Sequence, residues 1–133
     1  MRIETHEEAF ETHRRAIFKW ALEVEGIEKS QRIIGLHASR GITELLSIFL
    51  HKNRLIDEGF QLNHRWFKSE RVTGKLPEFS NKKGIVGKMV KLENLCETLA
   101  YGAPKSVGKT EEAINLFRDI EEMINRMLWK EKT

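Results

Sequence analysis

His64 is the histidine whose neighbours in the sequence are best suited to binding a ligand. Arg65, Lys68 and Arg71 follow it closely, and two aromatic residues lie among them. Cations that pair with phosphate and rings that stack on bases are what single-stranded nucleic acid contacts require. We therefore predict a ligand-binding site that includes His64, Arg65, Lys68 and Arg71. The alternative is a loop whose rings face the core and whose charges are only solvated.

Histidine could also carry general acid–base chemistry here. A histidine that accepts a proton, beside a cation that stabilises the charge on phosphate, would support cleavage of RNA without a metal. His64 is one candidate, and the pair of Arg32 and His37, five residues apart, is another. His37 falls on the apolar stripe of its predicted helix, where a hydrogen-bonded core histidine is the commoner situation. His64, His37 and Arg32 are therefore weak catalytic candidates.

Other chemical motifs are incomplete. The five histidines include no i, i+4 pair with a carboxylate suited to zinc, and the single cysteine, Cys96, cannot complete a thiolate site, so we expect no metal and no cofactor. Residues 102–110 resemble a phosphate-binding P-loop, but they have five residues between the glycines instead of four, and a predicted helix precedes them. We expect a turn between helices there, and a buried, inert thiol at Cys96.

Apolar residues recur at steps of three and four along most of the chain, and no segment alternates like a strand. This pattern predicts an all-α chain, a single domain over residues 1–133, folded as an antiparallel four-helix bundle. Gly41, in the middle of the second helix, either marks a close helix crossing or is simply tolerated there. Acidic pairs on the helices are expected to be solvated: Glu93 with Glu97, and Glu121 with Glu122. The predicted helices cover residues 6–25, 28 or 30 to 53, 84–101 and 110–129.

Local signals set the predicted helix ends and faces. Thr5 and Glu8 have the spacing of a capping box, and Thr110 is a suitable N-cap for the last helix. Trp20 and Val24 fall on the apolar stripe of the first helix. We therefore expect both of these side chains to face the core.

A long basic loop is predicted between the second and third helices. Residues 54–83 show no sustained period, apart from a short helix expected near 64–70. From residue 54 to residue 91 there are nine basic and four acidic residues, an excess of five positive charges. Loops of this length are usually functional or packed down by their own side chains. One end of the bundle should therefore be electropositive.

The composition points to an ordinary helical protein of the cytoplasm. The 133 residues are 40% hydrophobic and 32% charged, and the net charge of +3 is too small to indicate nucleic acid by itself. A single cysteine suits a reducing compartment. The first residues have no signal-peptide pattern, and we expect no stretch that approaches the roughly 20 apolar residues of a membrane span. We expect a cytoplasmic protein with no membrane contact.

The order of these features resembles the HEPN group of small helical domains. The resemblance rests on the helix layout, on Glu44-Leu45-Leu46 in the second helix, and on the end of the third helix at Tyr101 followed by Glu111-Glu112-Ala113. Active members of that group are metal-independent ribonucleases with an arginine and a histidine four to six residues apart on the third helix. Cys96 and Tyr101 stand at those positions here, so the resemblance implies that the usual catalytic pair is lost.

Three functional hypotheses follow. The first is a non-catalytic HEPN-like module that binds RNA or nucleotide, or a partner such as a nucleotidyltransferase, with Tyr101 as a further ligand-binding residue. The second is a toxin-like, metal-independent ribonuclease of the HEPN type. The third is a structural dimeric adaptor. The resemblance also implies a homodimer, since members of the group pair readily.

Overall fold

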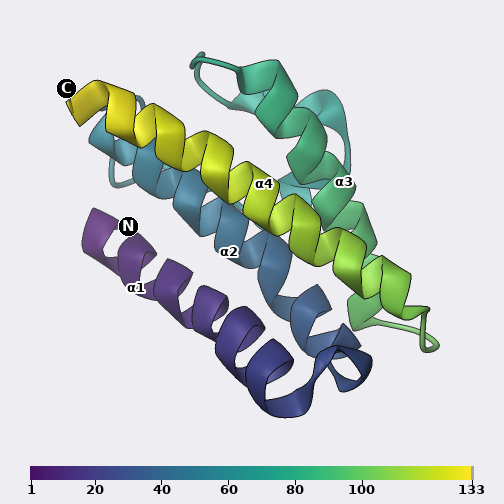
Figure 1. Cartoon of the computed structure of the whole chain (residues 1–133). Helices are drawn as coiled ribbons and strands as arrows, with labels where there is room; N and C mark the ends of the chain where they lie inside the picture. Colours follow the sequence, from purple (N-terminus) through teal and green to yellow (C-terminus); the bar gives the residue numbers. More distant parts are fainter. Residues whose placement is uncertain (133) are drawn as a thin grey trace.

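The computed structural model describes the backbone of residues 1–132 and the side chains of residues 1–128, and this part of the chain is helical with no strand. The all-α prediction is therefore confirmed. The four long elements lie close to the predicted ranges, and three short 3₁₀ turns accompany them (Figure 1). The elements are α1 (Ile3–Arg15) continued by the π-helix η1 (Ala16–Glu25), η2 (Ile27–Lys29), α2 (Gln31–Lys52), η3 (His64–Lys68), η4 (Glu70–Lys75), α3 (Lys82–Ala100) and α4 (Val107–Lys132).

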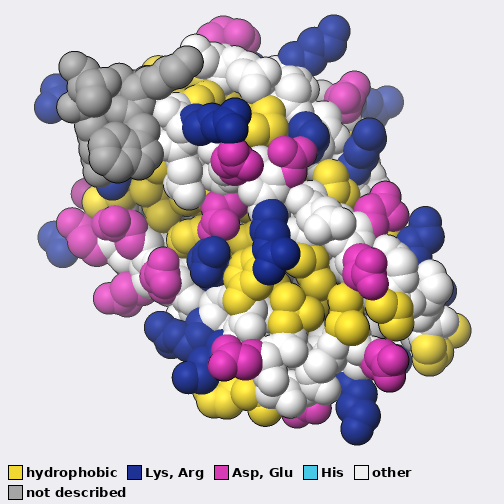
Figure 2. Space-filling view, viewed as in Figure 1, with side chains coloured by type: hydrophobic (Ala, Val, Ile, Leu, Met, Phe, Trp, Pro, Cys, Tyr) yellow, Lys and Arg dark blue, Asp and Glu magenta, His cyan; other side chains and the backbone are white. Residues whose placement is uncertain are grey.

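α2 is the central helix of the bundle, and the backbones of α1, α3 and α4 all pack against it. Successive long helices run in opposite directions, so that α4 lies along α2 and the two termini lie near the same end (Figure 1). α1 and η1 reach α4 through side chains: Phe10 of α1 and Phe18 of η1 lie against Phe117, and Arg14 of α1 forms an ion pair with Glu121. On the face shown in Figure 2, hydrophobic side chains gather between these two helices, with charged groups around them.

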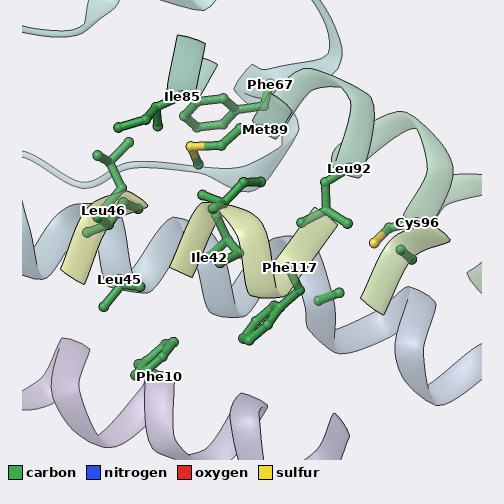
Figure 3. Close-up of a cluster of buried hydrophobic side chains, with 14 of the residues drawn as sticks. Phe10, Ile42, Leu45, Leu46, Phe67, Ile85, Met89, Leu92, Cys96 and Phe117 are labelled. Carbon is green, nitrogen blue, oxygen red and sulfur yellow. The ribbon is translucent and has the colours of Figure 1, made fainter. Parts of the chain in front are cut away.

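One hydrophobic core joins all four long helices. Phe10 of α1, Ile42 and Leu46 of α2, Leu92 of α3 and Phe117 of α4 converge in it, and each is at most 8% exposed (Figure 3). Burying a side chain of this size contributes about 1.5–3 kcal/mol. The core therefore fixes the relative positions of the helices.

The first helix departs from its predicted face because its second half is a π-helix. The i→i+5 hydrogen bonds of a π-helix widen the turn, so residues three apart no longer share a side. Ile17 and Ala21 are fully buried, whereas Trp20 is 52% and Val24 59% exposed. The prediction that Trp20 and Val24 face the core is wrong.

Two predicted helix caps are also wrong. α1 begins at Ile3, before the capping box expected at Thr5, and no side chain caps it. α4 begins at Val107, which places Thr110 inside the helix, where it is buried. Ser30 does precede α2, but its hydroxyl donates to the carbonyls of Ala21 and Gly26 and so ties α2 to the end of η1.

The loop between α2 and α3 is packed down by its own side chains. Phe67, in η3, is fully buried against the core, and Val72 and Leu76 are nearly so. Trp66 is half-buried, with the ammonium group of Lys75 4.8 Å from its ring. The rings of Trp66 and Phe67 therefore pack within the fold. This agrees with the alternative prediction, in which the rings of the loop face the core.

Among the glycines, Gly35 packs most tightly against another helix, at the end of α3. A Cβ atom at Gly35 would lie 2.5 Å from the backbone nitrogen of Ala100. Gly41, the position suggested by the sequence, also packs closely, since a Cβ there would lie 3.1 Å from His13 Cβ. The tighter of the two glycine contacts thus lies about 1.7 helical turns before the expected position.

α2 is long and apolar enough to cross a membrane by length and composition alone, contrary to the expectation that no stretch has this property. Most of its apolar window, 72%, is buried inside the bundle. The composition of α2 is therefore explained by its central place in the core, and it is weak evidence for a membrane span.

Candidate phosphate-binding site

Four of the five predicted ligand-binding residues line one cavity of about 260 Å³, which we call the near cavity. His64, Arg65 and Lys68 enter it from η3, and Tyr101 from the end of α3. Arg71 lies outside its lining. α2 and α3 form the rest of the wall, through Gly35, Leu36, Ser39, Arg40, Glu93, Cys96, Glu97 and Ala100.

A second cavity of about 320 Å³, the far cavity, adjoins the first. The two share Arg40, His64 and Arg65, so these three side chains stand between them. The remaining lining of the far cavity comes from α1, α2 and the residues before η3: His13, Thr43, Glu44, Leu62 and Asn63.

A buried carboxylate holds the imidazole of His64. Glu93 is only 4% exposed, and its Oε1 accepts hydrogen bonds from Ser39 Oγ at 2.7 Å and from His64 Nδ1 at 2.8 Å. An ionised carboxylate only accepts, so His64 carries a proton on Nδ1. Its Nε2 then accepts from Arg40 Nε at 3.3 Å. The expectation that Glu93 is a solvated surface charge is wrong, because the loop after α2 folds back over it.

Arg40 is a further candidate site residue, and its position in the sequence did not single it out. It is half-buried between the two cavities and takes part in none of the ion pairs formed by the described side chains. A cation removed from water without a counterion is costly and favours an anion nearby. The signal in the sequence was a lone arginine within an otherwise apolar stretch of helix, since such residues are rarely buried without a purpose.

His37 and His13 form a pair of hydrogen-bonded imidazoles near Arg40. Their Nδ1 atoms are 2.9 Å apart, so one ring donates and the other accepts. Burial, then the charges of His37, Arg40 and His64, lower the pKa of His13 to about 4. Burial and Arg40 also lower the pKa of His37. Both rings are therefore neutral at pH 7.

Arg32 binds the backbone at the end of α3 and does not form a site with His37. Its guanidinium donates to the carbonyls of Ala100 and Gly102, each at 3.3 Å. Gln31 binds the same turn from the other side, through Leu99 O and the backbone N–H of Lys105. These bonds fix the turn that presents the ring of Tyr101, which is 60% exposed.

Cys96 lines the near cavity, but its thiol is too buried to act as a nucleophile. It is 3% exposed, and burial raises the pKa of its thiol to about 12. Within the described residues, no cluster of three or more histidine, cysteine or acidic side chains is placed to hold a metal ion. The chemistry of the site therefore comes from its cations, its imidazole and the ring of Tyr101.

Comparison with protein-family models, with curated proteins and with solved structures finds no match to this chain. The HEPN resemblance therefore stays a prediction made from the sequence.

Proposed function

We propose that this chain is a nucleotide- or RNA-binding module that holds phosphate in the cavities around Arg40. The observation that carries the proposal is the half-buried, unpaired guanidinium of Arg40 among the described side chains, next to the imidazole of His64. Arginine forms two parallel hydrogen bonds with phosphate oxygens. Arg65 adds positive charge to the near cavity, where Lys68 is paired with Glu97 at 3.8 Å.

Tyr101 supplies the surface for a base. Its ring is exposed and lines the same cavity as Arg40, while the rings of Trp66 and Phe67 are engaged within the loop. Stacking of a base on an aromatic side chain contributes about 1–3 kcal/mol and tolerates any base. Binding should therefore depend on both the cations and Tyr101 and show little sequence preference.

The experiment is a titration of a fluorescein-labelled single-stranded RNA with the wild-type chain and with Arg40→Gln, at several salt concentrations. Loss of a charged hydrogen bond worth about 1.5–3 kcal/mol predicts roughly a 10- to 100-fold rise in Kd. The slope of log Kd against log salt should fall by about 0.7. Circular dichroism checks that the variant is folded.

The matched control is Arg126→Gln, which removes the same charge from an exposed position on α4, outside both cavities. It should change Kd less than twofold. Equal weakening by both variants would mean that binding is a diffuse effect of net charge, and the proposal would then be wrong.

A second function, metal-independent cleavage of RNA, is favoured by the contact between Glu93 and His64. A buried carboxylate on Nδ1 orients the imidazole, and Nε2, which accepts from Arg40 Nε at 3.3 Å, would become free to act as a general base once Arg40 turns to the phosphate. His64 Nε2 would take the proton of a ribose 2′-hydroxyl as that oxygen attacks phosphorus. The bond to the 5′-oxygen then breaks, and this oxygen takes a proton from water. The products are a 2′,3′-cyclic phosphate and a 5′-hydroxyl.

Incubating labelled RNA with the protein and a chelator tests this second function. Cleavage that His64→Asn abolishes, while RNA binding persists, would establish the enzyme. Intact RNA with the wild-type protein would leave binding as the only activity. Deoxyribose at the cleavage position is the control, because it lacks the attacking hydroxyl.

The homodimer and the nucleotidyltransferase partner implied by the HEPN resemblance stay predictions, as does the structural adaptor. Light scattering checks the first, since a dimer has twice the 15.6 kDa mass of one chain. RNA binding that weakens with salt would count against a purely structural adaptor.

A further inference from the structure

The near and far cavities lie in line along one side of α2. The α2 residues that line them are Gly35, Leu36, Ser39 and Arg40 for the near cavity, and Arg40, Thr43 and Glu44 for the far one. This spacing follows a single face of the helix. From residue 35 to residue 44 the helix rises about 13 Å. One nucleotide of a stacked strand advances only about 3.4 Å, so about 13 Å corresponds to nearly four stacked nucleotides. Two nucleosides therefore reach both cavities only if the strand is extended and its bases are unstacked.

The chemistry changes along this line. The shared wall between the cavities carries the cations Arg40 and Arg65, together with His64. The near cavity adds the exposed ring of Tyr101. The far cavity adds hydrogen-bonding groups: Asn63 Oδ1 accepts from the backbone N–H of Arg65, so the amide NH₂ of Asn63 remains to donate. Besides Glu93, two carboxylates line the cavities, and each has a partner: Glu97 pairs with Lys68 in the near cavity, and Glu44 pairs with His6 beside the far one. The remaining groups follow the order of a stacking group, then cations, then a neutral donor.

We infer that the ligand is a single polynucleotide strand that spans both cavities, with one internal phosphodiester between Arg40 and Arg65. This inference rests on the proposed function and adds the class of ligand to it. One nucleoside lies in the near cavity, against Tyr101, and the next lies in the far cavity, within reach of Asn63. A duplex does not fit this arrangement, because its bases are paired and stacked inside the helix and cannot enter two recessed cavities.

The decisive comparison is between a dinucleoside monophosphate and a nucleoside 5′-monophosphate. The dinucleoside, ApA, has one internal phosphate with one negative charge, whereas AMP has the greater charge. Simple attraction to a basic surface therefore favours AMP, while a strand that fills both cavities favours ApA. Calorimetric titration of the wild-type chain should give a Kd for ApA at least about 10-fold below that for AMP. This ratio corresponds to about 1.4 kcal/mol.

Further probes separate failure of this inference from failure of the proposed function. The deoxy analogue of ApA, a single-stranded tetranucleotide and a short duplex are titrated in parallel, and preference for either dinucleoside over AMP supports the inference. AMP bound as tightly as both dinucleosides, or a duplex bound as tightly as the single strand, overturns the inference and leaves the proposed function standing. If no probe binds, the proposed function is wrong and the inference falls with it.

Variants assign the two cavities. Asn63→Ser keeps a side chain able to cap η3 but removes the amide donor. Loss of a neutral hydrogen bond predicts a 2- to 10-fold weaker binding of ApA with no change for AMP. Asn115→Ser, at an exposed position on α4, is the matched control and should change neither. Tyr101→Ala should weaken both ligands. Equal effects of Asn63→Ser on ApA and AMP overturn the assignment.

Discussion

Replacing Gly35 by alanine tests the close packing of α2 against α3 that forms the base of the near cavity. The added Cβ would lie 2.5 Å from Ala100 N, 2.9 Å from Cys96 O and 2.9 Å from Leu99 C. These atoms belong to the backbone of α3, so no side chain can rotate away. The clash can be relieved only if the end of α3 moves outward.

The expected loss of stability is about 2 kcal/mol. Overpacking a well-packed contact costs about 1–3 kcal/mol, and backbone partners place Gly35→Ala at the upper end of that range. Removing glycine from a helix recovers roughly 0.5–1 kcal/mol. For a chain of 133 residues, 1 kcal/mol corresponds to about 4 °C in Tm. Thermal unfolding followed by circular dichroism should therefore show a fall of about 8 °C.

Gly87→Ala is the matched control on α3. A Cβ at Gly87 would meet only Glu70 Oε1, at an ordinary 3.6 Å, so this variant should be as stable as the wild type or up to about 4 °C more stable. Gly35→Ala should also weaken RNA binding, because movement of α3 displaces Tyr101 from the cavity. An unchanged or raised Tm for Gly35→Ala would refute the packing argument.

Other predictions concern protonation, thiol reactivity and the turn after α3. The folded state keeps His13 neutral, with a pKa of about 4 against 6.5 unfolded, so stability is full above pH 6.5 and falls by about 1–2 kcal/mol towards pH 4, after allowing for partial exposure. Urea unfolding at pH 7 and pH 4.5 measures this loss, and His13→Gln should reduce it. Cys96, with a thiol pKa near 12, should resist iodoacetamide at pH 8 and react fully in guanidinium chloride; labelling of the folded protein contradicts its burial. Arg32→Ala should lower stability by about 1 kcal/mol and weaken RNA binding, because the carbonyls of Ala100 and Gly102 lose their donor; unchanged binding would separate that contact from Tyr101.

The candidate site was only partly accessible to sequence reasoning. His64, Arg65 and Lys68 are close in the sequence, so their clustering could be recognised, and they line the near cavity with Tyr101. Arg40 could not be recognised as their neighbour, because it lies 24 residues before His64 on another helix. Nor could Glu93, whose sequence neighbourhood is that of an ordinary exposed helix residue. Its burial depends on η3 folding over α3.

The sequence by itself determined the helical class and the approximate range of each long helix, because a repeat of apolar residues every three or four positions is a local property of the chain. It also determined that basic residues concentrate around the second connection. Only the tertiary structure decided that Trp20 faces outward, that Phe67 anchors the loop, and that Glu93, His64 and Arg40 form one connected group. Burial and hydrogen-bond partners depend on contacts between distant segments, and the pattern within one helix does not contain that information.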